Sequence, residues 1–351
     1  MPTVLITGNL GYIGPVMTRT FKNAGYSVVG LDTDWFKDCC FFPLSEDNLA
    51  HRQIYKDIRY ADEHDLDGID AVVHLAGLSN DPLGELNPQL TGAINLQSTL
   101  GLARLCKKMA VKRFVFASSC SVYGIARTGS PITEEGTLNP ITAYAKAKID
   151  SEFGLVELAD RDFHPVLLRN ATVYGVTPKV RLDLVVNNLT AYAYLTKEIT
   201  ILSDGTPWRP IVHVDDFCRA FLCCVQAPAE KVHAQAFNVG DNSQNFRVKD
   251  IAEEIAEIMP QAKVLIKDQT GSDERSYRVD FSKIRRVIPE FQAKMTLQAG
   301  IRQLIEAYST NGLSLAGFNS EKFFRVRTIK SLIAAKRLDI NLEAVNKEAQ
   351  K

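Results

Sequence analysis

The stretch at residues 3–14, TVLITGNLGYIG, restricts the possible folds of this chain more than any other. An apolar run gives way to glycines at positions 8, 11 and 14, and an amphipathic segment with helical spacing follows. This order predicts a buried strand, a tight turn and a helix that begins on the turn. Glycines allow close backbone approach, and a helix N-terminus with free N–H groups suits a pyrophosphate. A plain α/β turn has the same spacing, so other features must distinguish the two.

A second strand is predicted at residues 27–32, and it ends in the acidic residue Asp32. This position falls about twenty residues past the glycines, where a carboxylate can accept hydrogen bonds from a ribose 2′-hydroxyl. The same negative charge would repel a 2′-phosphate, which favours NAD over NADP. The residues predicted to contact NAD here are Gly8, Gly11, Tyr12, Ile13, Gly14 and Asp32.

Strands and helices alternate through the first half of the chain. The predicted strands are at residues 53–58, 70–77, 112–119 and 164–169, and the helices at 90–109 and 143–159. This alternation predicts an α/β fold with a Rossmann-type doubly wound parallel sheet. Ligands lie beyond the carboxyl ends of such strands, so the glycine turn, Asp32 and Ser119 should line one crevice. The strand end at Leu75, Ala76 and Gly77 should join them, because small residues let the backbone approach a ligand.

Beyond residue 170 the alternation loosens. The predicted helices are at residues 185–195, 215–224 and 248–259, and the strands at 198–202, 211–214 and 236–239. Residues 1–170 with about 207–243 are predicted to form the NAD-binding Rossmann domain, and about 171–206 with 244–320 a smaller C-terminal α/β substrate lobe. Residues 321–351 are charged and helix-prone without an obvious core face, so we expect a surface helix or a partly ordered tail.

The composition argues against several classes of function. Lys and Arg together number 41, as do Asp and Glu, and no like-charge run stands out, so nucleic-acid or membrane binding through bulk charge is not expected. The chain opens on Met1-Pro2 and a strand, without a signal-peptide pattern, and no apolar run approaches the ~20 residues that span a bilayer. The seven cysteines lack CxxC spacing, which predicts reduced thiols in a cytoplasmic protein and no metal site.

Tyr144 and Lys148 are four residues apart, so they would share one face of the helix predicted at 143–159. A tyrosine phenol has an ordinary pKa of about 10, too high for a base at neutral pH. The nearby ammonium and the positive charge of an oxidised nicotinamide both favour the phenolate. The phenol can then take a proton from a sugar-like hydroxyl and return it in the reverse direction, while Ser119 holds the reacting oxygen.

Together, these and later motifs resemble the extended short-chain dehydrogenase/reductase family, in its UDP-glucose 4-epimerase-like, NAD-dependent nucleotide-sugar epimerase/dehydratase branch. They are the GxxGxxG glycines, HLAG at residues 74–77, SSCSVYG at 118–124, YxxxK at 144–148, LRNATVYG at 168–175 and RPIVHVDD at 209–216. The resemblance covers about residues 1–310. It implies a Rossmann lobe, a smaller sugar-nucleotide lobe, and catalysis on nucleotide-diphosphate sugars by the triad Ser119, Tyr144 and Lys148.

The resemblance assigns further residues. Asp57 and Ile58 match the pair that approaches the adenine, and Asn95 and Lys148 match residues near the nicotinamide ribose. The residues that match substrate contacts are Ser119, Ser121, Thr172, Asn187, Arg209 and Arg275. For the two arginines there is also a physical argument, because a guanidinium fork suits phosphate oxygens.

Several positions depart from the family's patterns. The 4,6-dehydratases carry an acid pair directly after the triad hydroxyl, and this chain has Cys120 and Ser121, which argues against dehydration. Thr172 stands where many relatives have an asparagine beside the sugar nucleotide, so the identity of sugar and base stays open. Trp208 would either stack on a nucleobase or fill the interface between the lobes.

The leading hypothesis is an NAD-dependent nucleotide-sugar epimerase that acts at C4 through a transient 4-keto sugar. The alternative is an NAD(P)H-dependent 4-keto-6-deoxysugar reductase, which uses the same triad. A non-catalytic Rossmann-fold sensor is a third reading, which the complete triad disfavours. Relatives commonly dimerise through two helices, so the resemblance also implies a homodimer joined by a four-helix bundle of segments 90–109 and 144–159.

Overall fold

The computed structural model describes residues 1–79, 81–125, 130–267 and 275–345. Its centre is a seven-stranded sheet whose strands are all parallel, in the order β10-β6-β5-β4-β1-β2-β3. The strands are β1 (Thr3–Thr7), β2 (Ser27–Asp32), β3 (Arg52–Tyr55), β4 (Ala71–His74), β5 (Arg113–Ser119), β6 (His164–Asn170) and β10 (Gln235–Val239). The strand order runs in opposite directions on the two sides of β1, which confirms the predicted doubly wound fold class.

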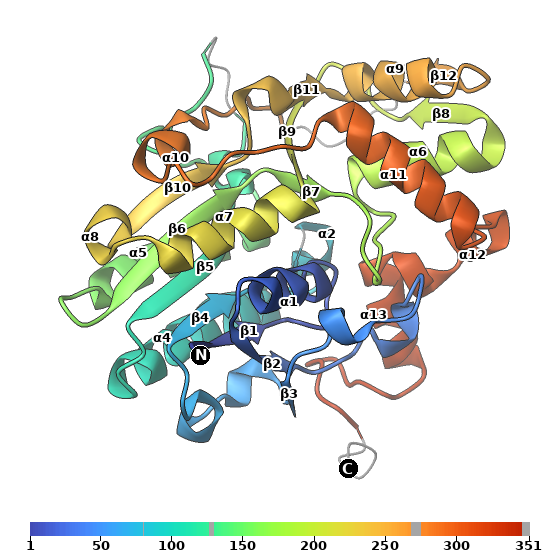
Figure 1. The fold of residues 1–351 in the computed structure, drawn as a ribbon. Coiled ribbons are helices and arrows are strands. Elements are labelled where there is room, and N and C mark those ends of the chain that lie inside the picture. Colours follow the sequence, from blue (N-terminus) through green and yellow to red (C-terminus); the bar gives the residue numbers. More distant parts are fainter. Residues whose placement is uncertain (80, 126–129, 268–274, 346–351) are drawn as a thin grey trace.

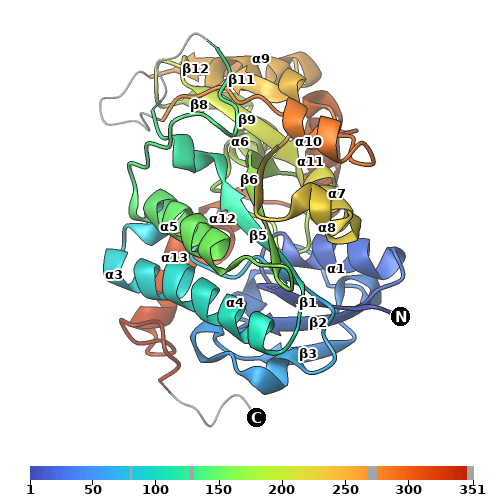
Figure 2. The same cartoon turned by 90° about the vertical axis from the view of Figure 1, so that its left-hand side faces the viewer.

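Helices cover both faces of this sheet (Figures 1 and 2). On one face lie α1 (Gly14–Asn23) and α7 (Val214–Gln226), and on the other α4 (Ser98–Lys108) and α5 (Ala143–Leu158). Apolar residues at helical spacing, such as Val16, Met17 and Phe21 of α1, are buried against the sheet. The segment predicted as one helix at 90–109 consists of α3 (Pro88–Thr91), a π-helical stretch (Gly92–Gln97) and α4.

The turn between β1 and α1 depends on its glycines. Gly8 has a φ of +73°, and a Cβ on it would lie 2.8 Å from the backbone nitrogen of Ala76. A Cβ on Gly14 would collide with the backbone of Asn9. The strand turns so sharply into the helix that neither position has room for a side chain. This turn presents the N-terminus of α1 beyond the sheet.

A smaller α/β layer lies beyond the carboxyl ends of β5 and β6 (Figure 1). Its strands are β7 (Thr172–Tyr174), β9 (Trp208–His213) and β11 (Asn245–Arg247) in one sheet, and β8 (Glu198–Ile201) with β12 (Lys263–Ile266) in another. Its main helices are α6 (Val185–Thr196), α9 (Val248–Ile258) and α11 (Leu297–Thr310). These elements share a separate apolar core, to which Val186, Ile251 and Leu304 contribute. The other short helices, which are distributed over both lobes, are α2 (Asp81–Gly84), α8 (Ala229–Val232), α10 (Ser282–Val287) and α12 (Leu315–Asn319).

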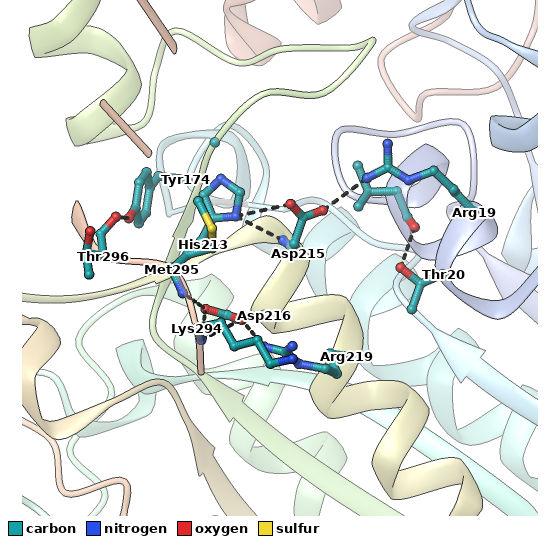
Figure 3. Close-up of polar contacts among 12 residues, drawn as sticks. Arg19, Thr20, Tyr174, His213, Asp215, Asp216, Arg219, Lys294, Met295 and Thr296 are labelled. Carbon is teal, nitrogen blue, oxygen red and sulfur yellow. Dashed lines mark hydrogen bonds and ion pairs between the residues drawn. The ribbon is translucent and has the colours of Figure 1, made fainter. Parts of the chain in front are cut away.

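The start of α7 joins this smaller layer to the central sheet (Figure 3). His213 accepts a hydrogen bond from the backbone N–H of Asp215 and packs edge-on against Tyr174, with ring centroids 5.4 Å apart. The Asp216 carboxylate accepts the backbone N–H groups of Lys294, at 3.0 Å, and Met295, at 2.9 Å. Asp216 of the RPIVHVDD motif therefore fastens the segment that leads into α11, while His213 packs against Tyr174 of β7.

The C-terminal segment is helical as predicted, but it is not a surface tail. Its helix α13 (Arg325–Ala334) packs back against the edge of the Rossmann lobe near β2 (Figure 1), where Ile329 and Leu332 are buried. Leu338 and Leu342 continue the same apolar cluster after the helix. The apolar residues are separated by charged ones, which hides the buried face in the sequence. Residues 346–351 of the predicted tail lie outside the described residues.

All seven cysteines lie among the described residues, and each of them is free of a disulfide. Within the described ranges, the structure contains no helix of sufficient length and apolar character to cross a membrane.

Candidate active site

A cavity of about 700 Å³ opens beyond the carboxyl ends of β1, β2, β4 and β5. All but three of the sequence-predicted site residues line it. They are Gly8, Gly11, Tyr12, Ile13, Asp32, Asp57, Ile58, Leu75, Ala76, Gly77, Ser119, Ser121, Tyr144, Lys148, Thr172, Arg209 and Arg275. The sheet topology explains this grouping, because parallel strands bring their carboxyl ends to one edge.

Two of the remaining three residues shape the cavity from behind. Gly14 is needed for the close approach of α1 to the backbone of Asn9. Asn95, predicted to lie near the nicotinamide ribose, holds the strand end after β4. Its Oδ1 accepts the backbone N–H of Leu78 at 2.7 Å, and its Nδ2 donates to the carbonyl of the same residue at 3.0 Å.

The third residue, Asn187, was expected beside the substrate diphosphate but does not line the cavity. It is fully buried on α6, where its Oδ1 accepts the backbone N–H of Gly175 at 3.1 Å. Its Nδ2 donates to the Tyr12 hydroxyl at 3.1 Å and to the Arg181 carbonyl at 2.9 Å. Asn187 therefore ties together two cavity-lining residues from distant parts of the chain, a role that its match to a substrate-contact position could not reveal.

The cofactor end of the cavity is formed by the glycine turn and the end of β2. Asp32 accepts the backbone N–H of Leu10 on Oδ2 at 3.0 Å and that of Asp34 on Oδ1 at 2.9 Å. Burial raises the pKa of Asp32, and the two N–H donors oppose that effect. The carboxylate is thus held in a fixed orientation at the cavity wall, where a ribose would present its hydroxyls.

Ser119, Tyr144 and Lys148 meet at the other end of the cavity. Ser119 ends β5, and its hydroxyl accepts hydrogen bonds from the Ser121 N–H at 3.1 Å and the Ser121 hydroxyl at 3.0 Å. The Lys148 Nζ lies 5.6 Å from the centre of the Tyr144 ring, one turn away on α5, and 4.6 Å from the centre of the Phe116 ring. The arrangement brings a hydroxyl, a phenol and an ammonium to one wall.

The electrostatics of Tyr144 differ from the sequence-based expectation. Burial raises the pKa of Tyr144 above its ordinary value, and the Asp81 carboxylate raises it further. The hydrogen bond with Ser119 and the charges of Arg181 and Arg275 act in the opposite direction. Desolvation outweighs these lowering effects.

Lys148 is itself strongly affected by its surroundings. Burial lowers its pKa to about 8, and the charge of Glu152 works against this effect. Glu152 is buried and pairs with Arg169, with 2.7 Å between Oε2 and Nη2. It also accepts a hydrogen bond from the Ser118 hydroxyl. This charged pair beneath the triad keeps a carboxylate near the lysine in an otherwise apolar setting.

Several residues that line the cavity carry no recognisable signal in the sequence. Asp81 pairs with Arg275 and accepts a hydrogen bond from Thr142, so it connects the N-terminal half of the site to a residue nearly two hundred positions later. Arg181 donates to the Ser79 hydroxyl at 3.0 Å. No local pattern marks these residues, since their partners come from other elements.

Four consecutive residues of the C-terminal segment also line the cavity, namely Phe324, Arg325, Val326 and Arg327. They face it together with Trp35 and Phe36 of the loop after β2. Trp208, by contrast, does not line it. The guanidinium groups of Arg278 and Arg247 lie 5.1 Å and 5.7 Å from the centre of the Trp208 ring.

His74 is buried at the end of β4 and does not line the cavity. Its ring nitrogens contact the hydroxyls of Thr7, at 2.7 Å, and Thr99, at 2.8 Å. Burial lowers its pKa to about 3, so the ring is neutral. Among the described residues, no three or more His, Cys, Asp or Glu side chains are grouped in a way that could hold a metal ion.

The residues present fit a dinucleotide. The turn leaves no room for a Cβ at Gly8 or Gly14, a fixed carboxylate stands at the end of β2, and a buried lysine and a half-buried phenol lie at the opposite end. Backbone N–H groups and the α1 N-terminus suit the diphosphate. Asp32 suits the adenosine ribose, and Lys148 the nicotinamide ribose.

Comparison with known proteins agrees with this geometry. Residues 4–240 match the model of the NAD dependent epimerase/dehydratase family. The UDP-glucose 4-epimerase of Bacillus subtilis (strain 168) is 29% identical over 268 residues, which are 68% of this chain and 76% of that protein.

Two solved structures superpose on most of the chain. One is TunA, an NAD-dependent NDP-hexosamine 5,6-dehydratase involved in tunicamycin biosynthesis, with a TM-score of 0.77, 25% identity and coverage of 88% of this chain and 98% of that one. The other is MoeE5 in complex with UDP-glucuronic acid and NAD, with a TM-score of 0.76, 27% identity and coverage of 89% and 100%. The chain described here belongs to the NAD dependent epimerase/dehydratase family, and its cofactor is NAD.

Proposed function

We propose that the protein is an NAD-dependent nucleotide-sugar epimerase that inverts C4 of the sugar through a transient 4-keto sugar. One observation carries the proposal. Ser119, Tyr144 and Lys148 line the same cavity as Asp32 and the glycine turn. A proton-transfer group therefore stands at the nicotinamide end of an NAD site.

Each residue of the triad has a distinct role in the proposed reaction. Bound NAD would supply the hydride acceptor for C4, and C4 would be inverted when the 4-keto sugar turns in the cavity and the hydride returns to its other face. Tyr144 takes the proton of the C4 hydroxyl and gives it back in the second half of the reaction. Ser119 hydrogen-bonds the reacting oxygen, and Lys148 supplies positive charge beside the phenol. The positive charge of the oxidised cofactor would offset the effect of burial on the pKa of Tyr144.

The positions after Ser119 support an epimerase over a 4,6-dehydratase. Cys120 is fully buried, and its Sγ donates to the Arg169 carbonyl at 3.2 Å. Ser121 lines the cavity, but a hydroxyl cannot replace a carboxylic acid in an elimination. The cavity-lining carboxylate of Asp81 is engaged by Arg275 and Thr142.

The experiment uses purified protein without added cofactor. Denaturation should release NAD in an amount close to that of the protein, and the native protein should convert UDP-glucose to UDP-galactose. In D₂O the product should carry no deuterium on carbon, because the C4 hydrogen travels as hydride and never exchanges with solvent. Deuterium at a neighbouring carbon would indicate proton abstraction from carbon, as in an elimination, and would contradict the proposal. A requirement for stoichiometric NADH or NADPH and a keto sugar would instead support the reductase.

The substrate and assembly are part of the same proposal. Arg209 and Arg275 line the cavity, and their guanidinium forks suit the diphosphate of a nucleotide sugar.

α4 and α5 lie side by side on one face of the molecule (Figure 2), and Phe153 and Val156 of α5 are exposed there. We expect these helices to pair with those of a second copy in a four-helix bundle. Light scattering should give twice the monomer mass, and Phe153→Glu should give a monomer.

A further inference from the structure

The first residue of α13, Arg325, is a buried cation that has no anionic partner among the described residues. Its side chain is 2% exposed. Nη2 donates to the Lys179 carbonyl at 2.9 Å, and the guanidinium lies 4.3 Å from the centre of the Phe36 ring. Nη1 is buried and has no hydrogen-bond partner among the described residues. No carboxylate of the described residues forms an ion pair with Arg325.

The acids in this region are already engaged by other groups. Asp34 pairs with Lys179 at 2.8 Å, and Asp183 pairs with Arg181 at 2.8 Å. Asp32 accepts two backbone N–H groups. An isolated buried charge with an orphan donor is costly, and proteins normally pair such a group or direct it to a ligand. The arrangement therefore indicates that an anion is the missing partner.

The position of Arg325 identifies the end of the cavity that it serves. Arg325 lines the cavity beside Phe36, in the loop that directly follows the ribose-facing Asp32. The sugar end, marked by Ser119 and Tyr144, belongs to other elements. The only strongly anionic part of NAD is its diphosphate, whose oxygens match a guanidinium fork. The glycine turn contributes only N–H groups and a helix dipole, so a full positive charge complements it.

We propose that Arg325 binds the diphosphate of NAD, and that the segment at residues 321–345 is a wall of the cofactor site. This inference rests on the family's NAD cofactor and not on the C4 epimerase reaction. The segment is anchored at the adenine side as well. Arg59 donates to the carbonyls of Asn341, at 2.9 Å, and Leu342, at 3.1 Å, and pairs with the cavity-lining Asp57 at 2.7 Å.

The test measures NAD binding by calorimetry on protein stripped of nucleotide. Arg325→Met keeps the length of the side chain and removes its charge, and we expect the dissociation constant for NAD to rise about 10- to 100-fold. ADP-ribose should show the same rise, whereas adenosine, which lacks phosphate, should bind both proteins equally. Arg337→Met is the matched control, since Arg337 lies on the same segment but is half exposed and pairs with Asp38 at 3.2 Å. Its NAD affinity should equal that of the unmodified protein.

Thermal melting with and without NAD separates binding from folding. Removal of an unpaired buried charge should leave the melting temperature of the nucleotide-free protein unchanged or higher, while the increase on adding NAD should shrink. An increase on adding NAD as large as that of the unmodified protein would overturn the proposal, whatever the melting temperature without NAD, because the charge would then contribute nothing to cofactor binding.

Three binding results would also contradict it. They are an unchanged NAD affinity in Arg325→Met, an equal loss of adenosine binding, and a loss of UDP binding with NAD binding intact. The last result would assign the guanidinium to the substrate's diphosphate. None of these measurements requires turnover of a sugar, so they succeed or fail independently of the proposed epimerase activity.

Discussion

Removal of the Tyr144 hydroxyl is the most direct test of the proposed chemistry. In Tyr144→Phe the ring remains beside Lys148, but no group is left to take the proton of the substrate hydroxyl. General acid–base groups contribute about 100- to 10,000-fold in rate, which corresponds to about 3–5 kcal/mol of activation free energy. We expect kcat to fall within this range.

The structure also limits the other effects of this change. The phenol is half-buried and hydrogen-bonds Ser119, so its loss should alter the free energy of unfolding by no more than about 1 kcal/mol. NAD content should stay the same, because the glycine turn and Asp32 are untouched. A lower rate with normal NAD content and folding would therefore report on proton transfer.

The assay follows conversion of UDP-glucose by chromatography across a range of pH. Tyr174→Phe is a matched control, since the Tyr174 hydroxyl is buried, donates to the Thr296 carbonyl at 3.2 Å and lies outside the cavity lining (Figure 3). Its rate should equal that of the unmodified protein. Loss of a general base should lower the rate at least about 100-fold. If Tyr144→Phe keeps a tenth or more of the activity, the assignment of Tyr144 as the base is wrong.

Three further predictions address the support of the site. Burial lowers the pKa of Lys148 to about 8, whereas a lysine in the unfolded chain has a pKa of about 10.4. Between these two pH values the unfolded chain binds more protons than the folded protein, so the free energy of unfolding should rise with pH, by at most about 3 kcal/mol. Urea unfolding of Lys148→Met should lack this rise, and an identical pH profile would refute the reasoning. Asn187→Ala leaves buried backbone groups unpaired and should cost about 3 kcal/mol or more, seen as a lower urea midpoint; a loss below about 1 kcal/mol would contradict the bracing role. Gly14→Ala should abolish NAD binding by forcing the β1–α1 turn apart, whereas Gly101→Ala, whose Cβ has nothing within 4 Å, should melt at the same or a higher temperature with NAD binding retained.

The sequence revealed the features of this fold that depend on local patterns. The glycine turn, Asp32 and the YxxxK pair each lie within one strand–turn–helix unit or on one helix face, so spacing alone places them. The topology rule for parallel sheets then brings them to one edge. Ser119, although distant from Tyr144 in the sequence, could be placed because it ends a predicted strand of the same sheet.

Contacts between distant segments were beyond such reasoning. The resemblance matches Asn187 to a substrate contact, but its side chain bonds three partners from separate parts of the chain. Because of these partners, Asn187 braces the cavity and does not line it. The buried face of α13 is similarly hidden, because its apolar residues are too few and too widely spaced to stand out among charges. The effect of burial on the pKa of Tyr144 also depends on surroundings that no local pattern contains.

The inferred cofactor wall bears on the choice between epimerase and reductase. An epimerase returns NAD to its starting state in every turnover, so it loses nothing when the cofactor is enclosed. A reductase must release its oxidised cofactor each time, and here release would require the segment anchored by Arg59 and Arg325 to move. Measurement of the NAD dissociation rate against kcat for UDP-glucose therefore connects the two proposals. A dissociation rate well below kcat is compatible only with a reaction that recycles its cofactor in place. A dissociation rate above kcat would show that the wall does not retain NAD, and would leave the choice to the substrate assays.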